Sequence, residues 1–292
     1  MTAPNALQAR DEILSVAGIA TPIIQCAPDR CADATEAVVF VHGNPGPRDD
    51  WEPLVRSVGT FARAVAWDHP GYGRADRPRA FDYTVDGYAR QLDRVLEVLD
   101  IERAHLVLHD FGGPWGLQWA ADHPDRVASV VLVNTGVLVD YRWHTLARIW
   151  RTPVVGEVFM ATSVRPMMQM VVNRNEPRPL PRSFFDTVFC HMDRGHRRAV
   201  RRLYRSVDDP SAAAERLVEA LAPHDHPTLV VWGRHDAYLP ERLAAAQRRA
   251  FPSARVELLD HSGHWPHIDA PEAVEALVVG FLAEQVGAAA AR

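Results

Sequence analysis

The most informative stretch of the chain is Ala104-His105-Leu106-Val107-Leu108-His109-Asp110-Phe111-Gly112-Gly113-Pro114. Its first half, residues 104–108, has the length and apolar composition of a buried strand. The glycines and Pro114 predict that a helix begins at once, because proline is tolerated in the first helical turn. Such an abrupt turn projects one side chain, that of Asp110, out of the sheet. The N–H groups at the start of the helix stabilise a carboxylate there.

Strand-like and helix-like runs alternate on both sides of this turn. Before it, a short apolar run ends at His42-Gly43-Asn44-Pro45, and residues 84–99 have helical periodicity. After it, strand-like runs are expected at residues 129–133, 228–232 and 255–259, with helices at 241–250 and 271–284. This alternation predicts an α/β fold, with a mostly parallel central sheet flanked by helices.

The alternation stops between about Val137 and Pro223. This segment is rich in arginine and aromatic residues and is interrupted by prolines, among them those at 153, 166, 177, 179 and 181. We interpret it as an inserted helical cap over the sheet. The predicted core then comprises residues 1–136 and 224–292, and the predicted cap residues 137–223.

Composition excludes several classes of function. The formal net charge is −5, whereas a nucleic-acid-binding protein carries a basic excess. No apolar run reaches the length of a membrane span, and the polar residues Met1–Arg10 lack the apolar run of a signal peptide. Three cysteines cannot all pair, which favours a reducing compartment. We therefore expect a cytoplasmic protein with no nucleic-acid or membrane partner, and a homo-oligomer stays open.

Two later residues are placed to work with Asp110. Asp236 follows the strand-like run that ends at Trp232, and His264 lies in the loop after the last predicted strand. The order nucleophile, acid, histidine is that of a known catalytic arrangement. The alternative acid position, after residues 129–133, carries Asn134, which has no charge. The alternatives without a catalytic role are that Asp110 caps the following helix and that His264 is a solvated loop residue.

The chemistry that these three residues allow has two steps. A carboxylate is a competent nucleophile at a saturated carbon that carries a leaving group. Attack by Asp110 leaves an ester on the enzyme, and a neutral His264 then deprotonates the water that hydrolyses it, while Asp236 fixes the histidine tautomer. The backbone N–H of Phe111 and a donor on the turn at residues 42–45 are predicted to stabilise the oxyanion.

These motifs resemble the α/β-hydrolase superfamily, specifically its aspartate-nucleophile branch of haloalkane dehalogenases and epoxide hydrolases. In the frame of Gly-x-Ser-x-Gly, Asp110 replaces the serine, Leu108 replaces the first glycine and Gly112 is kept. The turn at residues 42–45 is similar to that of dehalogenases, in which the asparagine helps the oxyanion hole and holds the released halide. The resemblance implies a small-molecule substrate bound between core and cap, with no metal and no organic cofactor.

The sequence differs from the usual pattern of each of these two enzyme groups at one feature of the site, so both activities are kept as expectations. Dehalogenases usually have a tryptophan after the nucleophile as a second halide donor, and this chain has Phe111. Epoxide hydrolases usually have two cap tyrosines that protonate the opening oxygen, and Tyr141 and Tyr204 are the candidates here. Trp143 is expected either to pack the cap or to line the pocket. The first choice is a haloalkane dehalogenase-like activity and the alternative an epoxide hydrolase. A non-hydrolytic or ligand-binding member of the same fold is the further alternative.

Overall fold

The computed structural model describes residues 9–290. In this part of the chain eight strands form one sheet in the order β1-β2-β4-β3-β5-β6-β7-β8. The first two are antiparallel to their neighbours, and the others run parallel. The strands are β1 (Arg10–Val16), β2 (Ile19–Cys26), β3 (Glu36–Val41), β4 (Ala64–Trp67), β5 (Arg103–His109), β6 (Val127–Val133), β7 (Thr228–Gly233) and β8 (Arg255–Leu259). The predicted α/β architecture with a mostly parallel sheet is confirmed.

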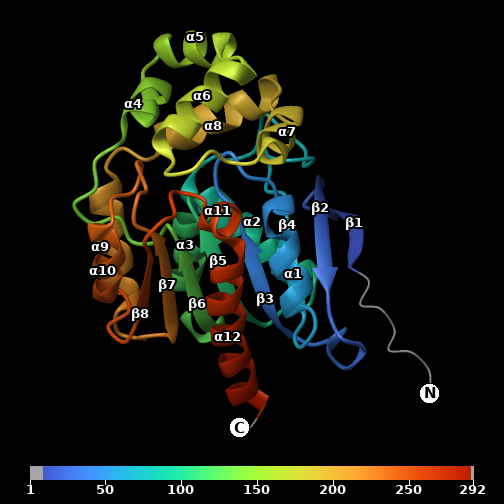
Figure 1. The fold of residues 1–292 in the computed structure, drawn as a ribbon. Helices are drawn as coiled ribbons and strands as arrows, with labels where there is room; N and C mark the ends of the chain where they lie inside the picture. Colours follow the sequence, from blue (N-terminus) through green and yellow to red (C-terminus); the bar gives the residue numbers. More distant parts are fainter. Residues whose placement is uncertain (1–8, 291–292) are drawn as a thin grey trace.

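Helices cover both faces of the sheet. Figure 1 shows α1 (Glu52–Val58) and α12 (Pro271–Ala290) on the near face, and α2 (Val85–Val98) and α3 (Gly112–Asp122) behind it. The side chains of β5 alternate accordingly: Leu106 and Leu108 pack with the α2–α3 layer, and Val107 packs with the α1–α12 layer. The remaining core helices are α10 (Arg242–Ala246) and α11 (Pro266–Asp269), with short 3₁₀ segments at Asp29–Cys31, Arg48–Trp51, Pro124–Arg126 and Gln247–Arg249.

Six helices connect β6 to β7. They are α4 (Thr145–Arg151), α5 (Val155–Thr162), α6 (Arg165–Asn175), α7 (Arg182–Cys190), α8 (Arg194–Ser206) and α9 (Pro210–Leu221). In Figure 1, α4–α8 lie above the carboxyl ends of the parallel strands, and we call these five the upper helices. The sixth, α9, packs against α3. The boundaries of the cap at residues 137 and 223 stay a prediction.

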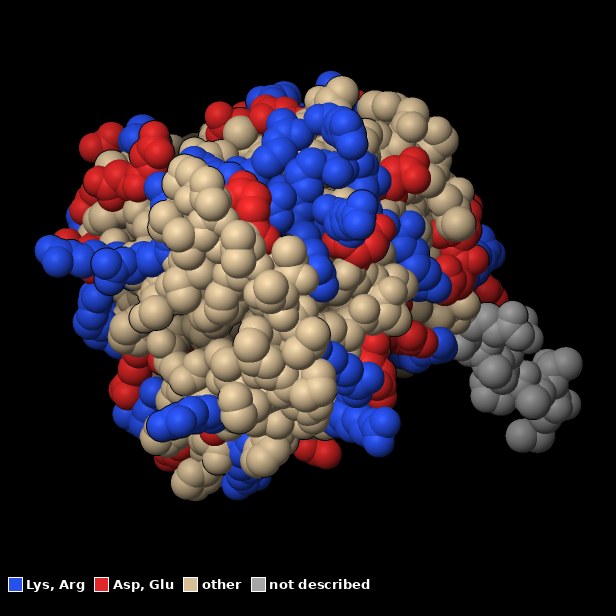
Figure 2. Space-filling view, turned by 90° about the horizontal axis from the view of Figure 1, so that it is seen from above, with Lys and Arg blue, Asp and Glu red and all other residues tan. Residues whose placement is uncertain are grey.

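Arginines attach the upper helices to the rest of the molecule. Figure 2, which looks down on this face, shows arginine side chains gathered on part of it. From α8, Arg198 donates a hydrogen bond to the backbone oxygen of Arg77, and Arg202 donates one to that of Arg79, both at 2.8 Å. These contacts hold α8 over the sheet. No helix in residues 9–290 is long and apolar enough to cross a membrane.

Candidate active site

The strand-to-helix turn at Asp110 has the geometry that the sequence predicts. Asp110 joins β5 to α3 with a φ of +48°, a left-handed conformation that is strained for any residue with a side chain. The turn is crowded from two sides. A Cβ on Gly112 would lie 2.3 Å from the backbone oxygen of Val41, and one on Gly43 would lie 2.4 Å from the Cβ of Asp110. Only glycine fits at these two positions, so the close packing around Asp110 depends on both of them.

The Asp110 carboxylate is held by one donor on each oxygen. Its Oδ1 accepts a hydrogen bond from the backbone N–H of Asn44 at 2.6 Å, and its Oδ2 lies 3.5 Å from Nε2 of His264. Burial by itself raises the pKa of Asp110. The hydrogen bond and charge of His264, with the Asn44 N–H, outweigh burial and lower that pKa below its usual value. Asp110 is thus ionised at neutral pH.

Asp236 orients His264 from the other side. Nδ1 of His264 lies 2.7 Å from Oδ2 of Asp236, and the histidine is 3% exposed. Burial lowers the pKa of His264, but the carboxylates of Asp236 and Asp110 reverse this effect and raise it to about 10. Asn134, which the sequence suggested only as a rejected acid, donates to the same Oδ2 at 2.7 Å. The structure thus brings Asp110, Asp236 and His264 together at the carboxyl ends of β5, β7 and β8.

Aromatic and amide groups lie above the carboxylate. Nδ2 of Asn44 donates to the hydroxyl of Tyr204 at 3.3 Å, so the Tyr204 hydroxyl is left with its own proton to donate elsewhere. The ring of Phe111 contacts that of Tyr204, with centroids 4.8 Å apart, and faces Trp143 at 6.4 Å. The Tyr141 hydroxyl accepts the backbone N–H of His144 at 3.4 Å.

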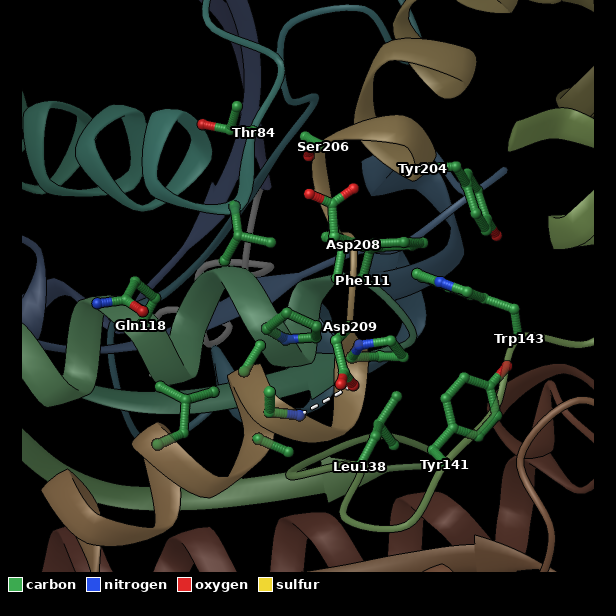
Figure 3. Close-up of a pocket in the computed structure, with 18 of the residues that line it drawn as sticks. Thr84, Phe111, Gln118, Leu138, Tyr141, Trp143, Tyr204, Ser206, Asp208 and Asp209 are labelled. Carbon is green, nitrogen blue, oxygen red and sulfur yellow. Dashed lines mark hydrogen bonds between the residues drawn. The ribbon is translucent and has the colours of Figure 1, made fainter. Parts of the chain in front are cut away.

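Two cavities meet at Asp110. The larger, ≈ 610 Å³, is lined by Asp110, Phe111, Tyr141, Trp143 and Tyr204. Figure 3 shows Phe111, Tyr141, Trp143 and Tyr204 around one end of it, with Thr84 and Gln118 on the opposite side. The smaller, ≈ 90 Å³, lies under the upper helices and has a mainly apolar lining that also includes Asn44 and His264. All eight residues proposed for the site from the sequence therefore lie at or beside these cavities.

Sequence reasoning missed His144, which lines both cavities. Its Nδ1 accepts the backbone N–H of Ala147 at 3.2 Å at the start of α4. Burial lowers the pKa of His144 to about 4, so the ring is neutral and its one proton is on Nε2. The only signal in the sequence was its place next to Trp143. In residues 9–290 no group of three or more His, Cys, Asp or Glu side chains is arranged to hold a metal ion.

Comparison with known proteins shows the family to which the chain belongs. The family described as "alpha/beta hydrolase fold" matches residues 36–157 and 173–271. A cis-3-alkyl-4-alkyloxetan-2-one decarboxylase of Xanthomonas campestris is 28% identical over 85% of this chain and 88% of its own length. Haloalkane dehalogenase 2 of Mycobacterium bovis is 28% identical over 83% of this chain and 86% of its own length.

Solved structures show the same fold. The haloalkane dehalogenase DatA of Agrobacterium tumefaciens superposes with a TM-score of 0.81 at 23% identity, over 95% of this chain and 97% of its own. A 2-hydroxy-6-oxo-6-phenylhexa-2,4-dienoate hydrolase from a Rhodococcus strain gives 0.78 at 21% identity, over 94% and 99%. With the family match over most of its length, the chain belongs to the alpha/beta hydrolase fold family.

Proposed function

We propose that this hydrolase acts at a saturated carbon of a small organic molecule through a covalent ester on Asp110. The observation that carries the proposal is an ionised aspartate on the strained turn, 3.5 Å from the Nε2 of a buried histidine. An aspartate in this position needs no base to become a nucleophile, unlike a serine. It displaces a leaving group from carbon, whose bonding electrons depart with that group.

The charge of the site separates the two steps. Before attack, the carboxylates of Asp110 and Asp236 keep His264 protonated, with a pKa of about 10. Esterification removes the negative charge of Asp110, so the pKa of His264 falls and the ring releases its proton to solvent, which balances the charge of the departing group. The neutral ring then deprotonates a water, which attacks the ester carbonyl, and the alcohol product leaves. Formation of the ester thus converts His264 into the base that the second step needs.

A carbon–halogen bond is the first candidate for the bond that breaks. A departing halide needs N–H donors in a dry pocket, and Asn44 offers its side-chain amide. Trp143 offers a second, because its Nε1 is buried without a hydrogen-bond partner among the described residues and the ring lines the larger cavity. The haloalkane dehalogenase among the relatives supports this reading.

An epoxide is the second candidate, and Tyr204 favours it. An alkoxide is too basic to depart unassisted near neutral pH, so a proton donor must reach it. The Tyr204 hydroxyl accepts from Asn44 and keeps its own proton for such a group. Burial raises the pKa of Tyr204 well above its ordinary value, so this proton is present throughout the neutral range.

A panel of halogenated alkanes and epoxides tests the two candidates. Halide release without diol formation is expected for a dehalogenase, and diol formation for an epoxide hydrolase. A non-hydrolytic or ligand-binding member of the fold would give neither product. Covalent labelling of Asp110 by an alkylating substrate separates these cases, because a pure binding protein would acquire no label.

Phe111→Trp is expected to tighten bromide binding or to raise turnover of bromoalkanes if a halide is the leaving group. The new indole N–H is placed beside Asp110, and a halide in a dry pocket gains from each additional donor. Bromide affinity by titration and halide release by ion chromatography measure the effect. Phe111→Leu, which changes the ring without adding a donor, is the control. No change in the Trp variant, with diol formation intact, would point to epoxide hydrolysis.

Replacement of both Tyr141 and Tyr204 by phenylalanine is expected to abolish epoxide opening. Loss of general acid catalysis costs about a hundred- to ten-thousand-fold. Because only Tyr204 has its hydroxyl bonded to Asn44, Tyr204→Phe alone is expected to account for most of the loss. Diol formation by each single variant and by the double variant is the measurement. Full activity in the double variant would remove the tyrosines from the mechanism and favour a halide leaving group.

A further inference from the structure

Glu176, in the connection between α6 and α7, contacts the backbone of the catalytic histidine. It follows the last residue of α6 and precedes Pro177, which disfavours the helical conformation in the residue before it. Glu176 is accordingly extended, with φ −100° and ψ 145°, and its side chain is turned away from solvent, with 8% exposure. Its carboxyl oxygens accept the backbone N–H of His264 at 3.1 and 3.4 Å.

The loop that carries His264 is shaped around this contact. A Cβ on Gly263 would lie 1.8 Å from Oε2 of Glu176, so glycine makes room for the carboxyl group. On the other side of His264, Trp265 packs into an apolar cluster of the upper helices with Phe184 and Phe185. The upper helices therefore contact the chain before, at and after the catalytic histidine.

A second acidic side chain holds the same loop from the core. Asp269, on α11, accepts hydrogen bonds from the hydroxyl of Ser262 and from the backbone N–H of Gly263, the latter at 2.8 Å. Asp269 thus holds the two residues before His264 from the core side, and Glu176 holds the backbone N–H of His264 from the side of the upper helices. Of these two acidic side chains, only Glu176 depends on the placement of the upper helices.

We propose that Glu176 is a positioning residue. While the upper helices are packed on the core, Glu176 holds the catalytic base, His264, in line with Asp236 and Asp110. Its kinetic consequence rests on the function proposed above, because only ester hydrolysis uses His264 as a base. The first step uses the Asp110 carboxylate, which Asn44 holds independently of Glu176. Loss of the contact should therefore affect the second step far more than the first.

The environment of Glu176 keeps its side chain neutral, so glutamine is a close substitute in charge and shape. Burial raises the pKa of Glu176 to about 8, and although the His264 imidazolium opposes this, the carboxylates of Asp236 and Asp269 reinforce it. Tyr238 also faces the group and stays neutral, because burial raises its own pKa to about 12. Near neutral pH the group is a carboxyl whose carbonyl oxygen accepts the His264 N–H, and a glutamine amide oxygen can do the same.

The test compares Glu176→Ala, Glu176→Gln and the control Asp186→Asn, which removes an exposed carboxylate of α7 that pairs with Arg165. In single-turnover experiments with a bromoalkane or an epoxide, Glu176→Ala should form the ester within about three-fold of the wild-type rate. Its ester should hydrolyse about ten- to a hundred-fold more slowly, because a misplacement of about 1 Å can cost that much. Glu176→Gln should recover most of the rate, and Asp186→Asn should match wild type. Equal slowing of both steps in Glu176→Ala, or no recovery with glutamine, would overturn the positioning role.

A spectroscopic measurement tests the inference without any substrate. The His264 Nδ1 proton shared with Asp236 is expected to give a low-field proton NMR signal, because the two atoms are 2.7 Å apart in a buried pair. Glu176→Ala should shift or broaden this signal, whereas Glu176→Gln and Asp186→Asn should leave it in place. An unchanged signal in the alanine variant would contradict the proposal. If wild-type enzyme forms no ester while the signal responds as described, the proposed function fails and the positioning role stands.

Discussion

Asp236→Asn is expected to fold and to turn over about a thousand-fold or more slowly than wild type, by analogy with the serine triad. Each carboxylate oxygen of Asp236 accepts two hydrogen bonds. Its Oδ1 accepts the backbone N–H groups of Tyr238 and Leu239 at 2.7 and 2.8 Å, and its Oδ2 accepts from His264 and Asn134, both at 2.7 Å.

An amide cannot satisfy this arrangement. If its oxygen stays on the two backbone N–H groups, its NH₂ faces the amide of Asn134 and Nδ1 of His264. The histidine must then accept at Nδ1 and place its proton on Nε2, the atom that has to take a proton from water. If the amide is turned over, its NH₂ faces two backbone donors, which costs stability. The loss of the carboxylate also removes the negative charge that contributes most to stabilising the His264 imidazolium.

The measurement is kcat for halide or diol formation, with circular dichroism to show that the variant is folded. Asp260→Asn, which changes an exposed acid paired with Arg234 beyond the site, is the matched control and should keep wild-type activity. A near-wild-type rate in Asp236→Asn would place the orienting acid elsewhere.

Much of the core could be predicted because its signals are local. Apolar runs of strand length, such as the one ahead of Asp110, alternate with helical periodicity, and parallel strands bring their carboxyl ends to one edge. Asp110, Asp236 and His264 are far apart in sequence but each follows a strand, so their meeting follows from the fold. Two short helices, α1 and α11, were not predicted, because seven and four residues are too few to show a helical period.

The contacts of the site with the upper helices could not be predicted. Strands are placed by their order in the sheet, but no such rule fixes the position of the upper helices. Nothing in the sequence therefore shows that Glu176 reaches the backbone of His264. Tyr204 was named as a candidate, but its bond to Asn44 depends on how α8 docks. The lack of charge on Asn134 excludes it as the acid, but this is only one property of an amide. As a donor to Asp236 it is useful because of its N–H group.

His264→Gln is expected to complete the first step and to stop before the second. Asp110 needs no base to attack carbon, and Asn44 still holds its carboxylate at 2.6 Å. Removal of His264 also removes a positive charge that lowers the pKa of Asp110, so the assay is best run at pH 8, where the carboxylate stays ionised. The ester that forms has lost the base that His264 supplies, and its hydrolysis should fall by about a hundred- to ten-thousand-fold.

The expected signature of His264→Gln is a burst without turnover. One equivalent of halide is released and the protein mass rises by the alkyl group, or one equivalent of epoxide is consumed and the mass rises by that of the whole epoxide. Peptide mapping should place the adduct on Asp110. The control is Asp110→Asn, which keeps the shape of the turn but has no nucleophile, and it should show neither burst nor adduct at first. An absence of adduct in both variants would contradict a covalent intermediate.

Wild-type enzyme run for one turnover in heavy-oxygen water tests the same step from the other side. If water attacks the ester carbonyl, one oxygen of the Asp110 carboxylate becomes heavy and the product of that first turnover keeps an oxygen that came from the enzyme. The geometry favours this route, because Nε2 of His264 lies 3.5 Å from Oδ2 of Asp110 and can activate a water beside this carboxyl group. Label that goes straight to the product, together with no adduct in His264→Gln, would mean that water attacks the substrate directly. Asp110 would then act as a base.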